Sequence, residues 1–122
     1  MSEQNVEACE RLAKQDCVPC RGGVPPLEAG EQARLLGELG HGWTVVEGHH
    51  LEKVYSFPDF KGALAFTNAV GAIAEAQNHH PEIALGWGRV KVTVWTHKID
   101  GLTENDFVLA ARVEQANRDA LH

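Results

Sequence analysis

Three of the seven histidines stand where an imidazole could move protons. His79 and His80 close a predicted long helix, immediately before Pro81, and His97 ends the last predicted strand. Because a helix C-terminus carries partial negative charge, it favours an imidazolium, which can donate a proton as a general acid. Glu75 precedes His79 by one helical turn, so its carboxylate can reach the imidazoles. This cluster is typical of a proton-transfer site.

Two other interpretations of these histidines stay open on spacing alone. Three histidines are a common zinc ligand set, but successive helical residues diverge by about 100°, which makes it difficult for His79 and His80 to share one ion. A cluster that only caps the helix is also compatible with the spacing. Asp106, in the first turn of the last predicted helix, adds a carboxylate whose ordinary role is to complement the helix N-terminus.

The elements that must position these side chains alternate between helices and hairpins. Apolar spacing predicts a helix from Leu27 to the glycines at 37–40, then strands over 43–46 and 51–57 with a turn at Gly48. Asp59 is the expected N-cap of the long helix, which Pro81 ends. The buried stripe of that helix is predicted to be Phe60, Leu64, Thr67, Val70, Ile73, Ala74 and Gln77.

A second hairpin is predicted over 82–85 and 89–96, with its turn at 86–88. Its second strand alternates valines with other residues, the pattern of a half-buried strand. Thr103 is expected to cap the last helix. The apolar residues of that helix are Phe107, Leu109, Ala110, Val113 and Ala116. The order of elements predicts an α+β fold in which helices cover one face of a four-stranded antiparallel sheet.

The composition fits one globular domain of 122 residues, with 43% hydrophobic and 23% charged residues, which excludes wholesale disorder. A net charge of -6 argues against a nucleic-acid-binding module, which needs a basic face. No apolar run reaches the ~20 residues of a membrane span. Residues 1–10 are polar and acidic, unlike a secretion signal, so we expect no membrane association and a cytoplasmic location.

All three cysteines, Cys9, Cys17 and Cys20, fall in the first twenty residues, and their odd number argues against a disulfide framework. We interpret residues 1–26 as an appendage with a short helix over about 3–15, and residues 27–122 as the domain. Because glycines and prolines at 22–26 separate Cys17 and Cys20 from the domain, we expect neither thiol to reach the histidines. A single C-x-x-C is compatible with three interpretations, which stay open: a redox pair, a metal shared between subunits, or spacing without a chemical role.

The residues around the histidines resemble the signature of the pterin-4a-carbinolamine dehydratases. At that family's spacing stand Glu75, His79, His80, Pro81, Trp87, His97 and Asp106. The similarity covers about residues 27–121 and implies the same α+β arrangement of sheet and helices. Members of that family are hydro-lyases of tetrahydrobiopterin recycling. They remove water from the 4a-hydroxytetrahydropterin that aromatic amino-acid hydroxylases release, and give quinonoid dihydropterin.

The resemblance assigns roles by position. It implies that His79 and His97 are general acids on opposite faces of the pterin, and that His80 binds substrate and acts as a base supported by Glu75. Helical spacing instead places Glu75 nearest to His79, and the sequence leaves open which imidazole the carboxylate touches. The resemblance implies no metal and no redox cofactor.

Substrate contacts are implied just before the histidine pair and around the third histidine. With the three histidines, these contacts are Asn78, Trp95, Thr96 and Lys98, and the supporting residues are Pro81, Trp87 and Asp106. Asn78 stands where some relatives have aspartate, so an acceptor is kept and a charge is lost. Trp95 is either an exposed residue of the sheet or a platform that stacks on the flat pterin.

The family also contains dimerisation cofactors of a homeodomain transcription factor and assembly factors, so a non-catalytic binding role is the alternative function. The complete acid–base set favours catalysis. Relatives form dimers by joining sheets and tetramers by packing helices. The Val-rich strand over 89–96 is predicted near a sheet edge, where unpaired backbone invites another copy. We therefore expect a homodimer or homotetramer, with a functional link to an aromatic amino-acid hydroxylase.

Overall fold

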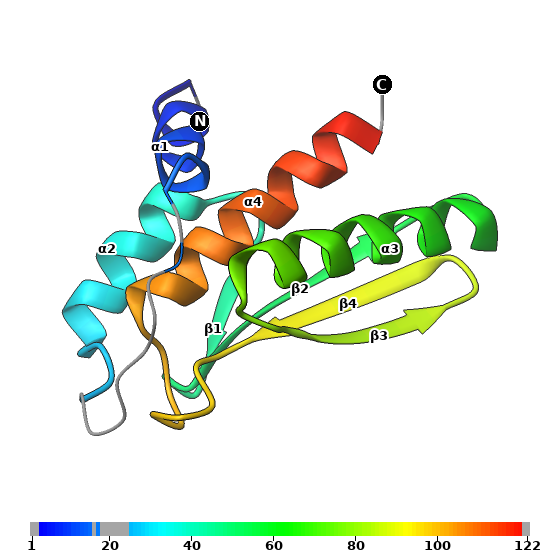
Figure 1. The fold of residues 1–122 in the computed structure, drawn as a ribbon. Coiled ribbons are helices and arrows are strands. Elements are labelled where there is room, and N and C mark those ends of the chain that lie inside the picture. Colours follow the sequence, from blue (N-terminus) through cyan, green and yellow to red (C-terminus); the bar gives the residue numbers. More distant parts are fainter. Residues whose placement is uncertain (1–2, 16, 18–24, 121–122) are drawn as a thin grey trace.

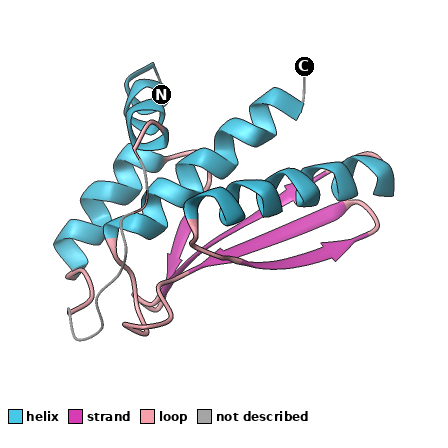
Figure 2. Cartoon of the chain, in the orientation of Figure 1, coloured by secondary structure: helices cyan, strands magenta, loops and turns pink. Residues whose placement is uncertain are grey.

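The computed structural model describes residues 3–15, 17 and 25–120, and in this part of the chain four helices lie on one face of a four-stranded antiparallel sheet (Figures 1 and 2). The helices and strands are α1 (Glu3–Ala13), α2 (Ala29–Leu39), β1 (Thr44–Val46), β2 (His50–Ser56), α3 (Phe60–Gln77), β3 (Glu82–Gly86), β4 (Arg89–Val94) and α4 (Glu104–Ala120). This architecture confirms the predicted fold class. None of these helices is long and apolar enough to cross a membrane.

The sheet has the order β1-β2-β4-β3, with every pair antiparallel. Val92 of β4 lies opposite Lys53 of β2 on one side and Ile83 of β3 on the other. The prediction that this Val-rich strand lies near a sheet edge is therefore wrong, and the edges are β1 and β3. The physical reason is burial. The valines of β4 are fully buried under the helices, and β4 has a neighbouring strand on each edge, β2 and β3, which shields them from solvent.

The core fills the space between the helix layer and the covered face of the sheet. Leu51 and Tyr55 of β2 alternate toward the helices, as do the three valines of β4. Helix α4 lies between α2 and α3 and also packs against α1 (Figure 1). Phe107, at 0% exposed, is among its buried residues, and each fully buried large apolar side chain contributes roughly 1.5–3 kcal/mol.

Helix α3 begins as predicted and buries Val70 and Ala74 of the predicted stripe, together with Ala63 and Phe66. The Asp59 carboxylate accepts a hydrogen bond from the Gly62 N–H at 2.8 Å, which confirms it as the N-cap. Phe60 and Leu64, predicted to be buried, are 44% and 39% exposed. The helix is apolar on more than one side, so periodicity does not select a face. The face that packs is set by Phe66, whose ring lies 4.6 Å from that of Tyr55 and 5.3 Å from that of Phe57.

A buried polar cluster ties α4 to the sheet. The Glu114 carboxylate, on a residue 4% exposed, accepts hydrogen bonds from Tyr55 Oη at 2.7 Å, Lys53 Nζ at 2.9 Å and Trp43 Nε1 at 3.2 Å. Burial raises the pKa of the Tyr55 hydroxyl far above its ordinary value, and the Glu114 charge raises it further. Such a cluster fixes the helix in one position on the sheet because each buried polar group has its partner there.

Helix α1 belongs to the same core as the rest of the molecule. Cys9, Leu12 and Ala13 are 2–3% exposed and contact the central cluster of buried residues. The expected short helix is therefore present and is packed against α2 and α4. The division of the chain at residue 26 stays a prediction.

Candidate active site

The end of helix α3 sets the direction of the two neighbouring histidines. The helix stops at Gln77, and Asn78 adopts the left-handed conformation, with φ of 53°, that Asn tolerates well at a helix C-terminus. His79 and His80 consequently lie in the chain that leads to β3. The expectation that both residues close the helix, with Glu75 facing His79 one turn away, is wrong because Asn78 turns the chain out of the helix first.

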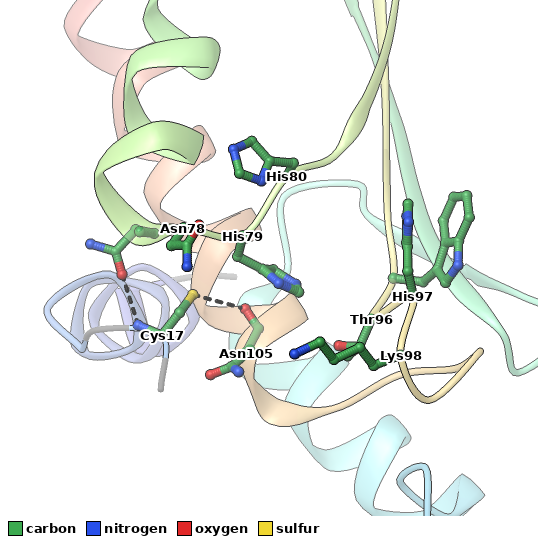
Figure 3. A pocket seen from close by; sticks show the side chains of 10 residues that line it. Cys17, Asn78, His79, His80, Thr96, His97, Lys98 and Asn105 are labelled. Carbon is green, nitrogen blue, oxygen red and sulfur yellow. Dashed lines mark hydrogen bonds between the residues drawn. The ribbon is translucent and has the colours of Figure 1, made fainter. Parts of the chain in front are cut away.

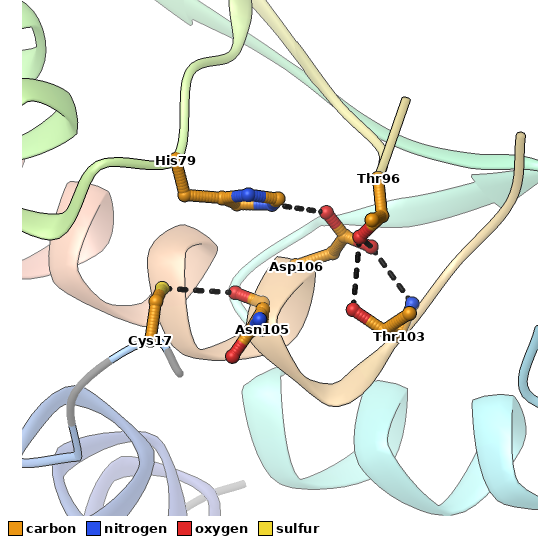
Figure 4. A network of polar contacts seen from close by, with 6 residues as sticks. All are labelled: Cys17, His79, Thr96, Thr103, Asn105 and Asp106. Carbon is orange, nitrogen blue, oxygen red and sulfur yellow. Dashed lines mark hydrogen bonds and ion pairs between the residues drawn. The ribbon is translucent and has the colours of Figure 1, made fainter. Parts of the chain in front are cut away.

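His79 is held by a buried carboxylate from the start of α4. Its Nε2 lies 2.6 Å from Asp106 Oδ1, and the two side chains are 13% and 0% exposed (Figure 4). Asp106 Oδ2 accepts hydrogen bonds from Thr96 Oγ1 and from the Thr103 N–H, both at 2.8 Å. The carboxylate thus complements the helix N-terminus and also binds the imidazole. Because an imidazole with one nitrogen engaged keeps a defined orientation, the other ring nitrogen, Nδ1, is the one left for a ligand.

His80 pairs with Glu75, the partner that the resemblance implied and that helical spacing had placed nearer to His79. Its Nε2 lies 2.6 Å from Glu75 Oε2. The two side chains are 53% and 78% exposed, so the pair lies in solvent. Solvent-exposed ion pairs contribute little to stability. The Glu75–His80 contact therefore matters for how the imidazole is oriented more than for folding.

His97 reaches the same region from the turn that follows β4. Its ring stacks on Trp95 with centroids 4.4 Å apart and an angle of 27° between planes. The other aromatic neighbours of Trp95 are the imidazoles of His49 and His50, at 5.4 Å and 6.1 Å. Buried Thr96, between the stacked pair in sequence, bonds through its N–H to the Gly101 carbonyl at 2.9 Å and holds the turn closed.

These segments enclose a cavity of about 430 Å³. It is lined by Cys17, Gln77, Asn78, His79, His80, Trp95, Thr96, His97, Lys98 and Asn105 (Figure 3). Every predicted substrate contact lines this cavity. Among the predicted supporting residues, Asp106 lies behind His79 and Thr96, and Pro81 follows His80 into β3. Trp87 is 70% exposed in the turn between β3 and β4 and does not line the cavity.

Sequence reasoning missed three lining residues, Cys17, Gln77 and Asn105. The Cys17 N–H donates to Gln77 Oε1 at 2.7 Å, and Cys17 Sγ lies 3.6 Å from the Asn105 carbonyl oxygen. The expectation that Cys17 stays away from the histidines is therefore wrong, because α1 packs on α4 and places Cys17 at the cavity. Asn105 could have been predicted as a residue of the site, because it precedes Asp106 in the sequence. Cys20 lies outside the described residues.

The arrangement suits proton transfer to a bound molecule. Three imidazoles face one cavity, two of them hydrogen-bonded to carboxylates, and the rest of its wall consists of three amide side chains, Cys17, Trp95, Thr96 and Lys98. Among residues 3–15, 17 and 25–120, no three His, Cys, Asp or Glu side chains are grouped so that they could hold a metal ion. The chemistry that these side chains themselves offer is general acid–base catalysis.

Comparison with known proteins places this geometry in a family. Residues 25–116 match the family described as pterin 4 alpha carbinolamine dehydratase. A protein from Rubrobacter xylanophilus, provisionally assigned that activity, is 58% identical over 104 residues, covering 85% of this chain and 96% of its own. One from Alkaliphilus metalliredigens, with the same provisional assignment, is 49% identical over 85% of this chain and 94% of its own.

Two solved structures share the fold. A transcriptional coactivator/pterin dehydratase from Brucella melitensis matches with a TM-score of 0.69 and 32% identity, covering 75% of this chain and 97% of that one. A pterin dehydratase-like protein identified as a RuBisCO assembly factor of the alpha-carboxysome matches with a TM-score of 0.54 and 27% identity, covering 62% and 89%. Relatives of this fold thus carry names of both catalytic and binding proteins.

Proposed function

Because the chain belongs to the pterin 4 alpha carbinolamine dehydratase family, we propose that it removes water from 4a-hydroxytetrahydropterin and releases quinonoid dihydropterin. The observation that carries this proposal is the convergence of three imidazoles on one cavity. One of the three, His79, is hydrogen-bonded to Asp106, which is completely buried. A purely structural role would not require imidazoles from two separate segments to face the same open cavity.

The reaction needs an acid and a base at neighbouring atoms. The 4a-hydroxyl is a poor leaving group, so a proton must be delivered to its oxygen as the C4a–O bond breaks. The N5 proton passes to a base, and the electron pair of the N5–H bond forms the new C4a=N5 double bond. Water leaves, and no electrons are gained or lost overall. Positioned general acids and bases typically contribute 10²–10⁴-fold to such a step.

The geometry supports one role for each imidazole. We assign His79 and His97 as acids on opposite sides of the pterin, since they come from segments on different sides of the cavity (Figure 3). Because Nε2 of His79 faces Asp106, the proton reaches the substrate from Nδ1. His80, with its Nε2 on Glu75, binds substrate and receives the N5 proton. Trp95 extends the surface beside His97 on which a flat ring system can lie.

Neither a metal nor a redox cofactor enters the proposed steps, because proton transfer alone completes the reaction. The alternative is a binding role without catalysis, as the name of the RuBisCO assembly factor indicates for that neighbour. The paired Glu75–His80 and Asp106–His79 contacts favour catalysis, since a surface that only binds a partner protein has no need to orient imidazoles toward a cavity.

Stopped-flow absorbance tests the proposal directly. 4a-hydroxytetrahydropterin, generated by an aromatic amino-acid hydroxylase, dehydrates spontaneously, and the protein should accelerate this step by a factor on the order of 10² or more. The acceleration should survive dialysis against EDTA. A matched control is the folded His79→Ala/His97→Ala variant, which keeps the cavity and loses both acids. A wild-type rate no faster than the spontaneous one would leave only the binding role.

A further inference from the structure

On the premise of the proposed dehydratase function, we propose that Cys17, which follows α1, forms an additional wall of the substrate site. The bound pterin then packs against Cys17, which helps to determine which pterins the site accepts. The chemistry of proton transfer stays with the histidines, whereas the fit of the substrate depends on this additional wall.

Gln15 and Cys17 are fixed in place by contacts to distant parts of the chain. Arg112 Nε and Nη2 both donate to the Gln15 carbonyl oxygen, at 2.9 Å and 2.6 Å, across 97 residues of sequence. The Cys17 N–H donates to Gln77 Oε1, and Cys17 Sγ lies against the Asn105 carbonyl, across 60 and 88 residues. Together with the burial of α1, these contacts hold Gln15 on α4 and Cys17 on both α3 and α4.

The position of Cys17 puts it within reach of a bound ligand. Cys17 and Asn105 lie on one side of the cavity, His97 and Lys98 lie on the other, and His79 stands between them (Figure 3). A pterin held between His79 and His97 meets Cys17 where it extends past the His79 ring, within the cavity that all three residues line (Figure 3). A cavity of about 430 Å³ is within the range of small-molecule sites and has room for the bicyclic ring together with its side chain, so the substituted pterin extends from the histidines to Cys17.

This wall lies outside the part of the chain that defines the family. The family match begins at residue 25, and the three histidines and both of their carboxylate partners fall within it. Cys17 precedes that region and still lines the cavity. An added wall that supplies none of the acid–base groups can change substrate affinity without changing the chemical step. We therefore expect its effect in KM and Kd.

Two substitutions at one position test this wall. Cys17→Ser keeps a small side chain that can donate to the Asn105 carbonyl, and Cys17→Phe fills the space in front of it. We expect Cys17→Phe to raise KM, and Kd for the unreactive analogue L-biopterin, by about tenfold or more while kcat changes by less than about threefold. Cys17→Ser should change all three by less than about twofold. Circular dichroism and thermal unfolding confirm that both variants are folded.

Alkylation of the wild-type protein gives an independent test. At about ten times its Kd, L-biopterin leaves roughly one site in eleven empty, so iodoacetamide should modify Cys17 about tenfold more slowly, as located by mass spectrometry. If tryptophan fluorescence shows that the pterin binds while Cys17 is alkylated at the same rate and Cys17→Phe binds normally, the wall is refuted and the dehydratase function stands. If no pterin binds the wild type, both proposals fail.

Discussion

Replacing Asp106 by asparagine isolates the contact that holds His79 at the site. The substitution keeps the shape of the side chain and exchanges one carboxylate oxygen for an NH₂ group. Asp106 accepts from His79 Nε2, Thr96 Oγ1 and the Thr103 N–H. Since one amide has a single oxygen, at least one of these groups must face the NH₂ group, and His79 can do so only as a neutral imidazole with Nε2 unprotonated.

The magnitude follows from the burial of this group. Hydrogen bonds to charged groups contribute about 1.5–3 kcal/mol, and an unsatisfied buried donor costs about 1–3 kcal/mol. With Asp106 at 0% exposed, we expect Asp106→Asn to lower the free energy of unfolding by about 2–3 kcal/mol. If the lost orientation of His79 costs the transition state about 1.4–2.8 kcal/mol, kcat falls by roughly 10- to 100-fold.

Stopped-flow dehydration and urea unfolding measure the two effects separately. The matched control is Asp100→Asn, because Asp100 also pairs with a histidine, His49, at 2.8 Å but is 86% exposed on its side chain. That pair is screened by solvent, so both the rate and the stability should stay near the wild-type values. A folded Asp106→Asn protein that turns over at the wild-type rate would refute the assignment of Asp106 as the positioning residue of His79.

Four further outcomes are expected. His79→Ala and His97→Ala should each slow dehydration about 10²-fold, but for opposite 4a stereoisomers, and equal rates on both isomers would contradict the two-acid assignment. His80→Ala and Glu75→Gln should raise KM more than those changes do; a normal KM with abolished kcat would overturn the binding role of His80. Tyr55 is the only tyrosine, and the absorbance of its tyrosinate form should rise only on unfolding. The free energy of unfolding should fall above about pH 10, because the unfolded state loses the phenolic proton of Tyr55 at a lower pH than the folded state does. Tyr55→Phe should remove this slope. Sedimentation should find at least a dimer at micromolar concentration; a monomer would contradict the expected assembly.

Local patterns predicted much of the fold. The turn at 86–88 and the alternating valines after it are short-range signals, and so is the Asp59 cap, which the structure confirms. The order of the strands in the sheet could not be predicted from such local patterns. It depends on β4 meeting β2 across more than thirty intervening residues, and the sequence carries no local mark of that pairing.

The candidate site likewise contains residues that local sequence predicted and residues that it did not. Asn78, His79 and His80 are adjacent in sequence, and so are Trp95 to Lys98, so spacing alone could point to both groups. The partner of each histidine depended on one backbone angle, the positive φ of Asn78, which periodicity does not reveal. Cys17 could not be placed, because its position results from the packing of α1 on α4.

The packing of α1 on α4 also fixes when the site can be assembled. A ribosome makes α1 first and α4 last, and the Gln15–Arg112 contact joins residues 97 apart. Until α4 has left the exit tunnel, α1 has only α2 to pack against, and the site lacks Asp106 and the contact that holds Cys17 on Asn105. Chains released early would therefore expose the apolar face of α1 and have no complete cavity, which makes them natural clients of chaperones and proteases.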